Sequence, residues 1–244
     1  MPTEPHQDGE GEALRPEYPI GVPSKFDPDG NVQRFPGNTI VAHLPLSSPI
    51  YASLLKLYER LSTCHLSGLL AMLPPSSWHV TLFEGVCDQV RAQEGFWPCD
   101  PGLPVDAPLD DCTSSFAGKL REFDLRCDPP YRFVIVGFSP LDVGIGIHVE
   151  LQTPPEESRL RGLRDRLAET LKIRHPQHDV YEFHLSMAYL LRHLSDSQKS
   201  ELTALLLGHL QDMPKVFELG APEFCTFDNM LQFDHLFYLG DQEK

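Results

Sequence analysis

Two short apolar stretches of the chain each place a histidine two residues before a hydroxyl side chain. The first pairs His79 with Thr81, and the second pairs His184 with Ser186, about a hundred residues later. Residues two apart on a strand share one face, so each stretch would present an imidazole beside a hydroxyl. Imidazoles titrate near neutral pH, and hydroxyls donate hydrogen bonds to phosphate oxygens. The pattern favours acid–base chemistry at a phosphoester.

In-line displacement at a phosphodiester needs a base for the attacking oxygen and an acid for the leaving oxygen on the opposite side. Two histidines in opposite protonation states supply both, and each proton transfer typically accelerates a reaction about 100- to 10,000-fold. We expect His79 and His184 to fill these roles, with Thr81 and Ser186 orienting the phosphoryl oxygens. No metal is chemically required. Which histidine is the base stays open, because the two motifs are chemically alike.

The histidine–hydroxyl pattern alone is weak, because the chain contains it four times. The other copies pair His65 with Ser67 and His193 with Ser195. The first of these follows the end of a predicted helix, and Ser195 is better explained as the N-cap of the next helix. The motifs at 79 and 184 are selected because they lie inside strong strand patterns, where histidines with purely structural hydrogen bonds are the alternative.

Apolar periodicity and turn residues predict the elements that position these motifs. Strands are expected at residues 39–44, 68–73, 78–83, 131–138, 143–151 and 181–191. Helices are expected at residues 48–63, 116–123, 153–171 and 195–210, with short edge strands after them. This order indicates an α+β fold with antiparallel pairing. A leucine-rich helix precedes each motif strand, which suggests a diverged duplication.

Four aromatic or amide side chains near the motifs have two interpretations each. Phe83 falls on the face of His79, where it either stacks on a base or belongs to the core. Asn38, just before the strand at 39–44, either reaches the substrate or forms a turn. Tyr181 and Tyr189 are out of phase with His184 unless a bulge intervenes, so we expect both to serve packing.

Other ligand sites find little support in the sequence. His175 and His178 lie close together, but no H-E-x-x-H or paired C-x-x-C pattern accompanies them, so we interpret them as part of a solvated loop. The glycines at 137, 144 and 146 do not form a dinucleotide-binding fingerprint. We therefore expect no metal and no cofactor.

The amino-acid composition indicates which binding partners and which cellular compartment to expect. Twenty lysines and arginines face 35 acidic residues, a net charge of -15, so a long nucleic acid is disfavoured as a partner and a small nucleotide is favoured. Six cysteines without a C-x-x-C pair, and no long apolar run, indicate a cytoplasmic protein, expected to be a monomer. The domain organisation also follows from composition. Residues 1–24 are acidic and rich in proline, so they are predicted to be disordered. Residues 25–244 are predicted to form one domain, in which residues 86–115 form a loop or lid.

The chain resembles the two-histidine phosphoesterase superfamily of RNA ligase-like and cyclic nucleotide phosphodiesterase-like proteins. The resemblance rests on residues 78–83 and 183–189 and, for one little-characterised branch, on residues 35–39, 73–79, 83–86 and 181–184. It implies two lobes related by approximate two-fold symmetry, each an antiparallel sheet backed by helices, with both motifs lining a central cleft. Ser186 replaces the commoner threonine and keeps its hydroxyl.

The resemblance also implies a hydrolase acting on 2′,3′-cyclic, 2′,5′-linked or similar small phosphodiesters. Two alternatives remain: a module that binds a nucleotide without turnover, and a protein that processes or joins RNA ends. The net charge of -15 disfavours the last of these.

Overall fold

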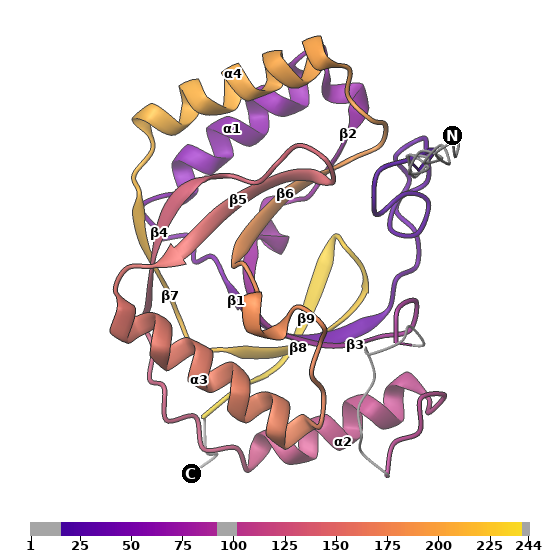
Figure 1. Ribbon diagram of the computed structural model, residues 1–244, viewed down its shortest axis with the longest axis vertical. Coiled ribbons are helices and arrows are strands. Elements are labelled where there is room, and N and C mark those ends of the chain that lie inside the picture. The colour runs from indigo at the N-terminus through magenta and orange to yellow at the C-terminus, as the bar shows by residue number, and fades with distance from the viewer. Residues whose placement is uncertain (1–15, 92–101, 241–244) are drawn as a thin grey trace, which may run out of the picture.

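A single curled antiparallel sheet forms the centre of the molecule in the computed structural model, which describes residues 16–91 and 102–240 (Figure 1). The strands within this range are β1 (Gly37–His43), β2 (Leu70–Met72), β3 (His79–Cys87), β4 (Tyr131–Phe138), β5 (Gly144–Leu151), β6 (His184–Leu190), β7 (Val216–Leu219), β8 (Glu223–Asn229) and β9 (Gln232–Tyr238). Their order is β7-β4-β5-β6-β3-β1-β8-β9, and β2 pairs with the end of β6.

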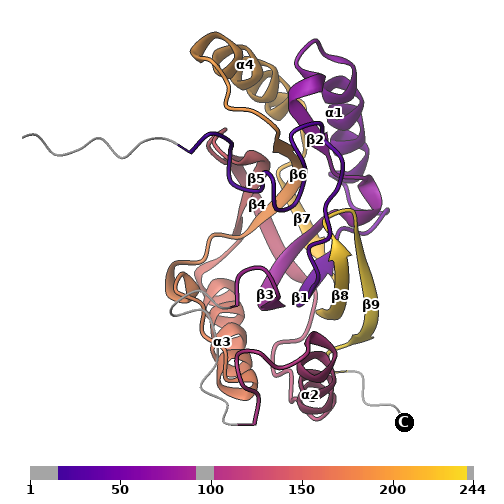
Figure 2. The same cartoon turned by 90° about the vertical axis from the view of Figure 1, so that its right-hand side faces the viewer.

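The sheet divides into two halves with matching arrangements. In each half a motif strand, β3 or β6, lies at the inner edge, and three further strands follow outwards. The halves join where Val80 of β3 pairs with Leu185 of β6. The predicted α+β fold with two pseudo-symmetric lobes is confirmed, and the two expected sheets are halves of one curled sheet (Figure 2).

Two helices back each half of the sheet. In Figure 1, α1 (Tyr51–Thr63) and α4 (Asp196–Asp212) lie together at one end, and α2 (Leu109–Arg121) and α3 (Pro154–Leu171) lie at the other. Two of the three expected N-caps are present: the Thr153 side chain accepts a hydrogen bond from the Glu156 amide, and Ser195 forms a capping box with Gln198, whereas Ile50 rather than the expected Ser48 precedes α1. Helices α3 and α4 begin where the sequence predicted, whereas α1 begins three residues after the predicted start at residue 48, and α2 begins at Leu109 rather than at residue 116.

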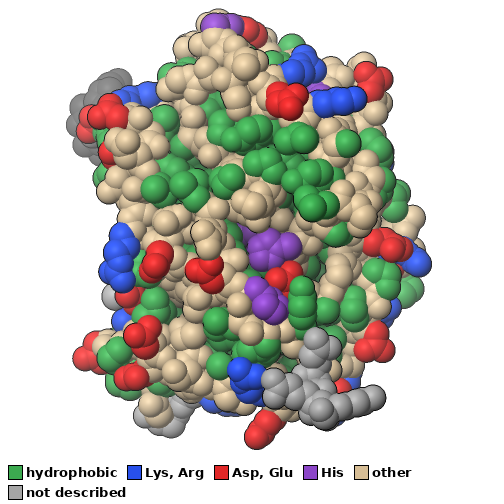
Figure 3. Space-filling model, turned by 180° about the vertical axis from the view of Figure 1, so that it is seen from behind, with side chains coloured by type: hydrophobic (Ala, Val, Ile, Leu, Met, Phe, Trp, Pro, Cys, Tyr) green, Lys and Arg blue, Asp and Glu red, His purple; other side chains and the backbone are tan. Residues whose placement is uncertain are grey.

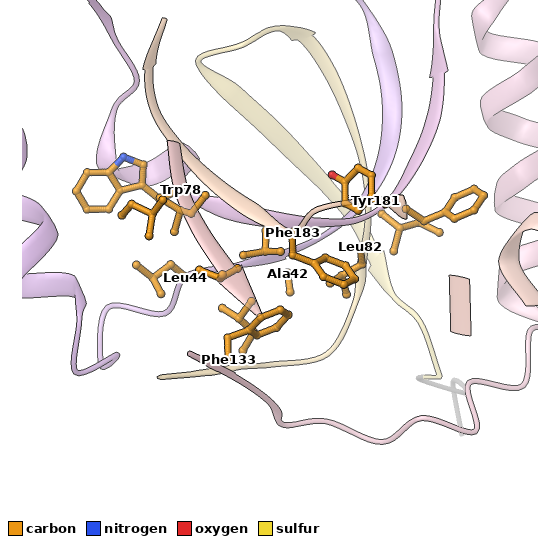
Figure 4. Close-up of a cluster of buried hydrophobic side chains, with 14 of the residues drawn as sticks. Ala42, Leu44, Trp78, Leu82, Phe133, Tyr181 and Phe183 are labelled. Carbon is orange, nitrogen blue, oxygen red and sulfur yellow. The ribbon is translucent and has the colours of Figure 1, made fainter. Parts of the chain in front are cut away.

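The apolar side chains of the motif strands point away from the histidines into a continuous core. Val80 and Leu82 are fully buried, whereas His79 and Thr81, which alternate with them along β3, are only partly buried. Figure 4 shows the neighbouring part of this core, where the Phe133 ring lies 5.8 Å from the Phe183 ring. Each such buried side chain contributes roughly 1.5–3 kcal/mol. Core burial thus fixes which face of each strand the histidines occupy.

A one-residue bulge interrupts each motif strand directly after its hydroxyl residue. In β3, Leu82 has no partner on β1, although the residues on either side of it do. In β6, Met187 likewise has no partner on β5. A bulge shifts the alternation of side chains by one residue. The faces predicted from strict alternation are therefore wrong beyond residues 81 and 186.

Some predicted boundaries need correction. Residues 16–24 are ordered, and Val22 packs in a small apolar cluster with Phe26 and Phe35, so the folded part begins before residue 25; residues 1–15 lie outside the described residues. Of the predicted lid, residues 86–87 belong to β3 and residues 109–115 to α2, while residues 92–101 are not described. Among the late strands, β8 is internal, because it pairs with both β1 and β9.

No helix in the described ranges has the length and apolar character needed to cross a bilayer. The five cysteines described there are free thiols.

Candidate functional site

The four motif side chains line one cavity of about 600 Å³. Antiparallel pairing of Val80 with Leu185, the middle residues of the two motifs, places His79 on the side of Ser186 and Thr81 on the side of His184. The cavity lining includes neither His65 nor His193. Strand context thus separated the two motifs that share a cavity from the two that do not.

Both histidine rings are held by the same main-chain interaction. Nδ1 of His79 lies 2.7 Å from the carbonyl oxygen of Ser77, and Nδ1 of His184 lies 3.0 Å from that of Glu182. A carbonyl only accepts, so each Nδ1 donates its proton, and in the neutral ring the lone pair resides on Nε2. Each half of the site therefore presents an imidazole in the same tautomer.

The two histidines differ in their surroundings. The pKa of His79 is lowered to about 4, chiefly by burial; the Ser77 carbonyl opposes this shift, and the charges of His43 and His184 add to it. The ring of Phe233 lies 4.2 Å from the His79 ring, and the ring of His43 lies 5.8 Å away. His79 is consequently neutral at physiological pH, as a general base must be.

A carboxylate between two histidines lies beside His79. One Glu223 oxygen is 3.0 Å from Nδ1 of His43, and the other is 3.0 Å from Nδ1 of His235. Burial raises the pKa of Glu223, but hydrogen bonds from His43 and His235 outweigh it and hold the pKa below its usual value. The sequence analysis missed this cluster, because strand pairing brings together residues nearly two hundred positions apart.

A buried arginine supports the floor of the cavity next to Thr81. Arg164 is 1% exposed, donates a 2.6 Å hydrogen bond to the carbonyl of the bulged Leu82, and lies 4.1 Å from the Tyr181 ring centroid. The Tyr181 hydroxyl lies close to Thr81, and burial raises the pKa of Tyr181. Burial lowers the pKa of Arg164. Arg164 thereby holds in place both the bulge at Leu82 and the side chain of Tyr181, which lie next to Thr81.

The two predicted substrate-contacting residues differ in their placement. Phe83 is fully buried in the core and does not line the cavity, because the bulge at Leu82 turns it away and brings Glu84 to the groove face. The expectation that Phe83 shares the face of His79 is wrong. Asn38 lines the cavity but is 1% exposed, and its amide is held within the protein by Val86 and Thr113.

Three side chains assigned to packing or to solvent lie at the cavity. Tyr189 reaches it because the bulge at Met187 reverses the side-chain phase, and Tyr181 reaches it from the segment just before β6. His175 is 4% exposed and approaches the Glu84 carbonyl at 2.9 Å, so the predicted solvated loop is wrong. His178, in the same loop, is 3% exposed.

Two groups in the described residues have atoms close enough to share a metal ion, within 4.8 Å of one another. They are His43, Glu223 and Cys225, and Asp165, His178 and Asp179. In both groups the histidine already has a carboxylate partner, at 3.0 Å for His43 and 2.9 Å for His178. The histidine–carboxylate contacts in both groups are therefore hydrogen bonds.

The sequence of residues 25–144, which include the first motif, matches the model of a family described as 2H-phosphodiest, domain of unknown function (DUF1868). The crystal structure of ATU0111, a conserved protein of unknown function from Agrobacterium tumefaciens str. C58, is 29% identical, with a TM-score of 0.82 and coverage of 92% of this chain and 94% of that chain. This similarity extends over most of the chain.

More distant similarities are also found. Apo LigT of E. coli is 8% identical, with a TM-score of 0.45 and coverage of 84% of this chain and 96% of LigT. TT0787 of Thermus thermophilus is 12% identical, with a TM-score of 0.44 and coverage of 84% and 98%. No curated protein sequence matches the chain significantly. Residues 25–144 of the chain, which carry the first motif, are thus similar to a two-histidine (2H) phosphodiesterase family.

Proposed function

We propose that this protein is a metal-independent hydrolase of a small cyclic or 2′-linked nucleotide phosphodiester, for example a 2′,3′-cyclic phosphate. The observation that carries the proposal is the pair of identically oriented imidazoles, each beside a hydroxyl, in one cavity. A cavity of about 600 Å³ is of a size for one small ligand. On the face drawn in Figure 3, the described lysines and arginines are scattered among acidic side chains, which suits a small substrate better than a long RNA.

The mechanism assigns one proton transfer to each histidine. Neutral His79 takes a proton through Nε2 from a water molecule, whose oxygen attacks phosphorus, and protonated His184 donates a proton to the departing ribose oxygen. The P–O bond to that oxygen breaks as the new P–O bond forms, which leaves a phosphomonoester. Thr81 and Ser186 donate hydrogen bonds to the nonbridging oxygens as their charge develops. Each turnover leaves His79 protonated and His184 neutral, and exchange with water restores both.

The direct test is phosphorus NMR of the purified protein incubated with 2′,3′-cyclic mononucleotides, 2′,5′-oligoadenylate and a cyclic phosphate of ADP-ribose, with and without EDTA. We expect one phosphodiester class to be converted to a monoester at the same rate in both conditions. Tight binding of a cyclic nucleotide without any product after long incubation would instead show a binding module.

The pH dependence should identify His79 as the base. Because its pKa is lowered to about 4, His79 stays neutral down to that pH, and the acidic limb of kcat/KM is expected near pH 4 rather than near 6.5. Replacing Phe233 with alanine admits water to the His79 ring and should move this limb to higher pH. A wild-type rate that falls as pH rises above 4 would make His79 the acid.

The hydroxyl of Ser186, rather than its size, should matter for catalysis. We expect Ser186→Ala to lower kcat roughly 10- to 100-fold, because one donor to the phosphoryl oxygens is lost. Ser186→Thr restores the hydroxyl found in the first motif and should stay within a few-fold of wild type. Steady-state kinetics on the substrate found by NMR measures both. Equal losses in the two variants would assign Ser186 a packing role.

A further inference from the structure

Part of the cavity lining is apolar and differs in chemistry from the catalytic groups. This part comes from the N-terminal segment, from the ends of β3 and β6, and from the β8–β9 hairpin. We call it the apolar compartment and define it by Ile20, Lys25, Phe35, Tyr189, Phe227 and Met230. Aromatic rings dominate this lining, and such rings accept the flat face of any nucleobase.

Lys25 is the one lysine or arginine among the described residues that line the cavity. Its Nζ lies 3.0 Å from the hydroxyl of Tyr189 and is held over two aromatic rings, 4.9 Å from the centroid of Tyr189 and 5.1 Å from that of Phe35. An ammonium has three donors, of which the tyrosine hydroxyl accepts one. The cation is thus held in the cavity wall, and two of its donors remain beyond the one that Tyr189 accepts.

Three other polar side chains of this region, Tyr189, Asn38 and Gln89, are already engaged. The Tyr189 hydroxyl accepts from Lys25 and lies within donating distance, 3.6 Å, of the Met230 sulfur. The carboxamide nitrogen of Asn38 donates to Thr113, and that of Gln89 donates to the Arg34 carbonyl. Lys25 is therefore the charged group of the apolar compartment, and an ammonium offers donors only.

The distance from the catalytic groups suits the length of a nucleotide. Tyr189 follows Ser186 by three residues on β6, which corresponds to about 10 Å of strand. The bulge at Met187 turns both side chains into the same cavity. A phosphate held by the two motifs would place its nucleobase, roughly one ribose away, beside Lys25.

We propose that the apolar compartment is a nucleobase subsite in which Lys25 selects keto bases, uracil and guanine, over amino bases, adenine and cytosine. Uracil and guanine present a carbonyl oxygen, O4 or O6, at the edge where cytosine and adenine present an amino group. An ammonium donates to the carbonyl but meets the amino group donor to donor. The inference rests on the proposed function for the position of the phosphate, and it adds the identity of the base.

The test compares Lys25→Met with Lys199→Met, a surface lysine paired with Asp142 away from the cavity. Isothermal titration calorimetry measures the affinities for uridine and adenosine 3′-monophosphates, which need no turnover, and kcat/KM is measured on the matching 2′,3′-cyclic phosphates. Wild type and Lys199→Met should prefer uridine. Lys25→Met should reduce the uridine-to-adenosine ratio about tenfold, the loss typical of one hydrogen bond to a charged group.

Binding and turnover separate the two proposals. Base-selective binding without hydrolysis would overturn the proposed function and leave the subsite standing. A ratio that Lys25→Met leaves unchanged, a wild-type preference for adenosine, or no nucleotide binding at all would overturn the subsite. If Lys25→Met does not fold, Tyr189→Phe removes the hydroxyl that positions Nζ and should lower the same ratio; an unchanged ratio in that variant overturns the assignment.

Discussion

Replacing either His79 or His184 with alanine is expected to lower kcat by about 100- to 10,000-fold, because each variant loses one of the two proton transfers. The double variant should be little worse than the poorer single variant, since groups that act in one step are not additive. The measurement is kcat on the phosphodiester identified by NMR, with circular dichroism to show that the fold persists.

The chain supplies matched controls for this experiment. His65→Ala and His193→Ala remove histidines of the same pattern that lie outside the cavity, and both variants should keep kcat within about twofold of wild type. Turnover retained in the His79→Ala/His184→Ala double variant would refute two-histidine catalysis outright.

Replacing Arg164 with methionine is expected to lower the free energy of unfolding by about 1–3 kcal/mol, because the buried Leu82 carbonyl loses its donor. We also expect kcat to fall at least tenfold, because the bulge and the Tyr181 ring would no longer hold Thr81 in place, and small displacements of catalytic groups are costly. Chemical denaturation gives the first quantity and steady-state kinetics the second.

Arg159→Met is the matched control, because Arg159 lies on the same helix and donates to the Asp128 carbonyl at the surface. Its effect on stability should stay within about 0.5 kcal/mol, with kcat unchanged. If Arg164→Met kept both the stability and the rate of Arg159→Met, the buried cation would have no part in shaping the site.

Local sequence signals predicted the elements well where one physical cause dominates. The caps at Thr153 and Ser195 placed the starts of α3 and α4, and β-branched, apolar runs located β4, β5 and both motif strands. Predictions of pairing were weaker. That β8 lies inside the sheet depends on its partner β1, far away in the chain, and nothing local to β8 indicates it.

The candidate site was predictable up to the point at which each strand departs from regular alternation. His79 and Thr81 both line the cavity because they are two residues apart on a regular stretch of strand. Phe83 lies beyond the bulge at Leu82 and does not line the cavity, and no local sequence signal predicts this bulge. The same cause hid Tyr189 in the second half. Signals for Lys25, Arg164 and Phe233 were absent for another reason, since tertiary contacts alone bring them to the motifs.

The identical anchoring of the two imidazoles also bears on how such a site tolerates divergence. The acceptor of each Nδ1 proton is a main-chain carbonyl two residues upstream, at Ser77 and at Glu182. Every amino acid carries that carbonyl, so substitution at either position cannot delete the acceptor while the backbone keeps its path. Each half of the gene thus needs to conserve little beyond a histidine, a hydroxyl and a strand, which leaves the surrounding cavity walls free to acquire new specificities.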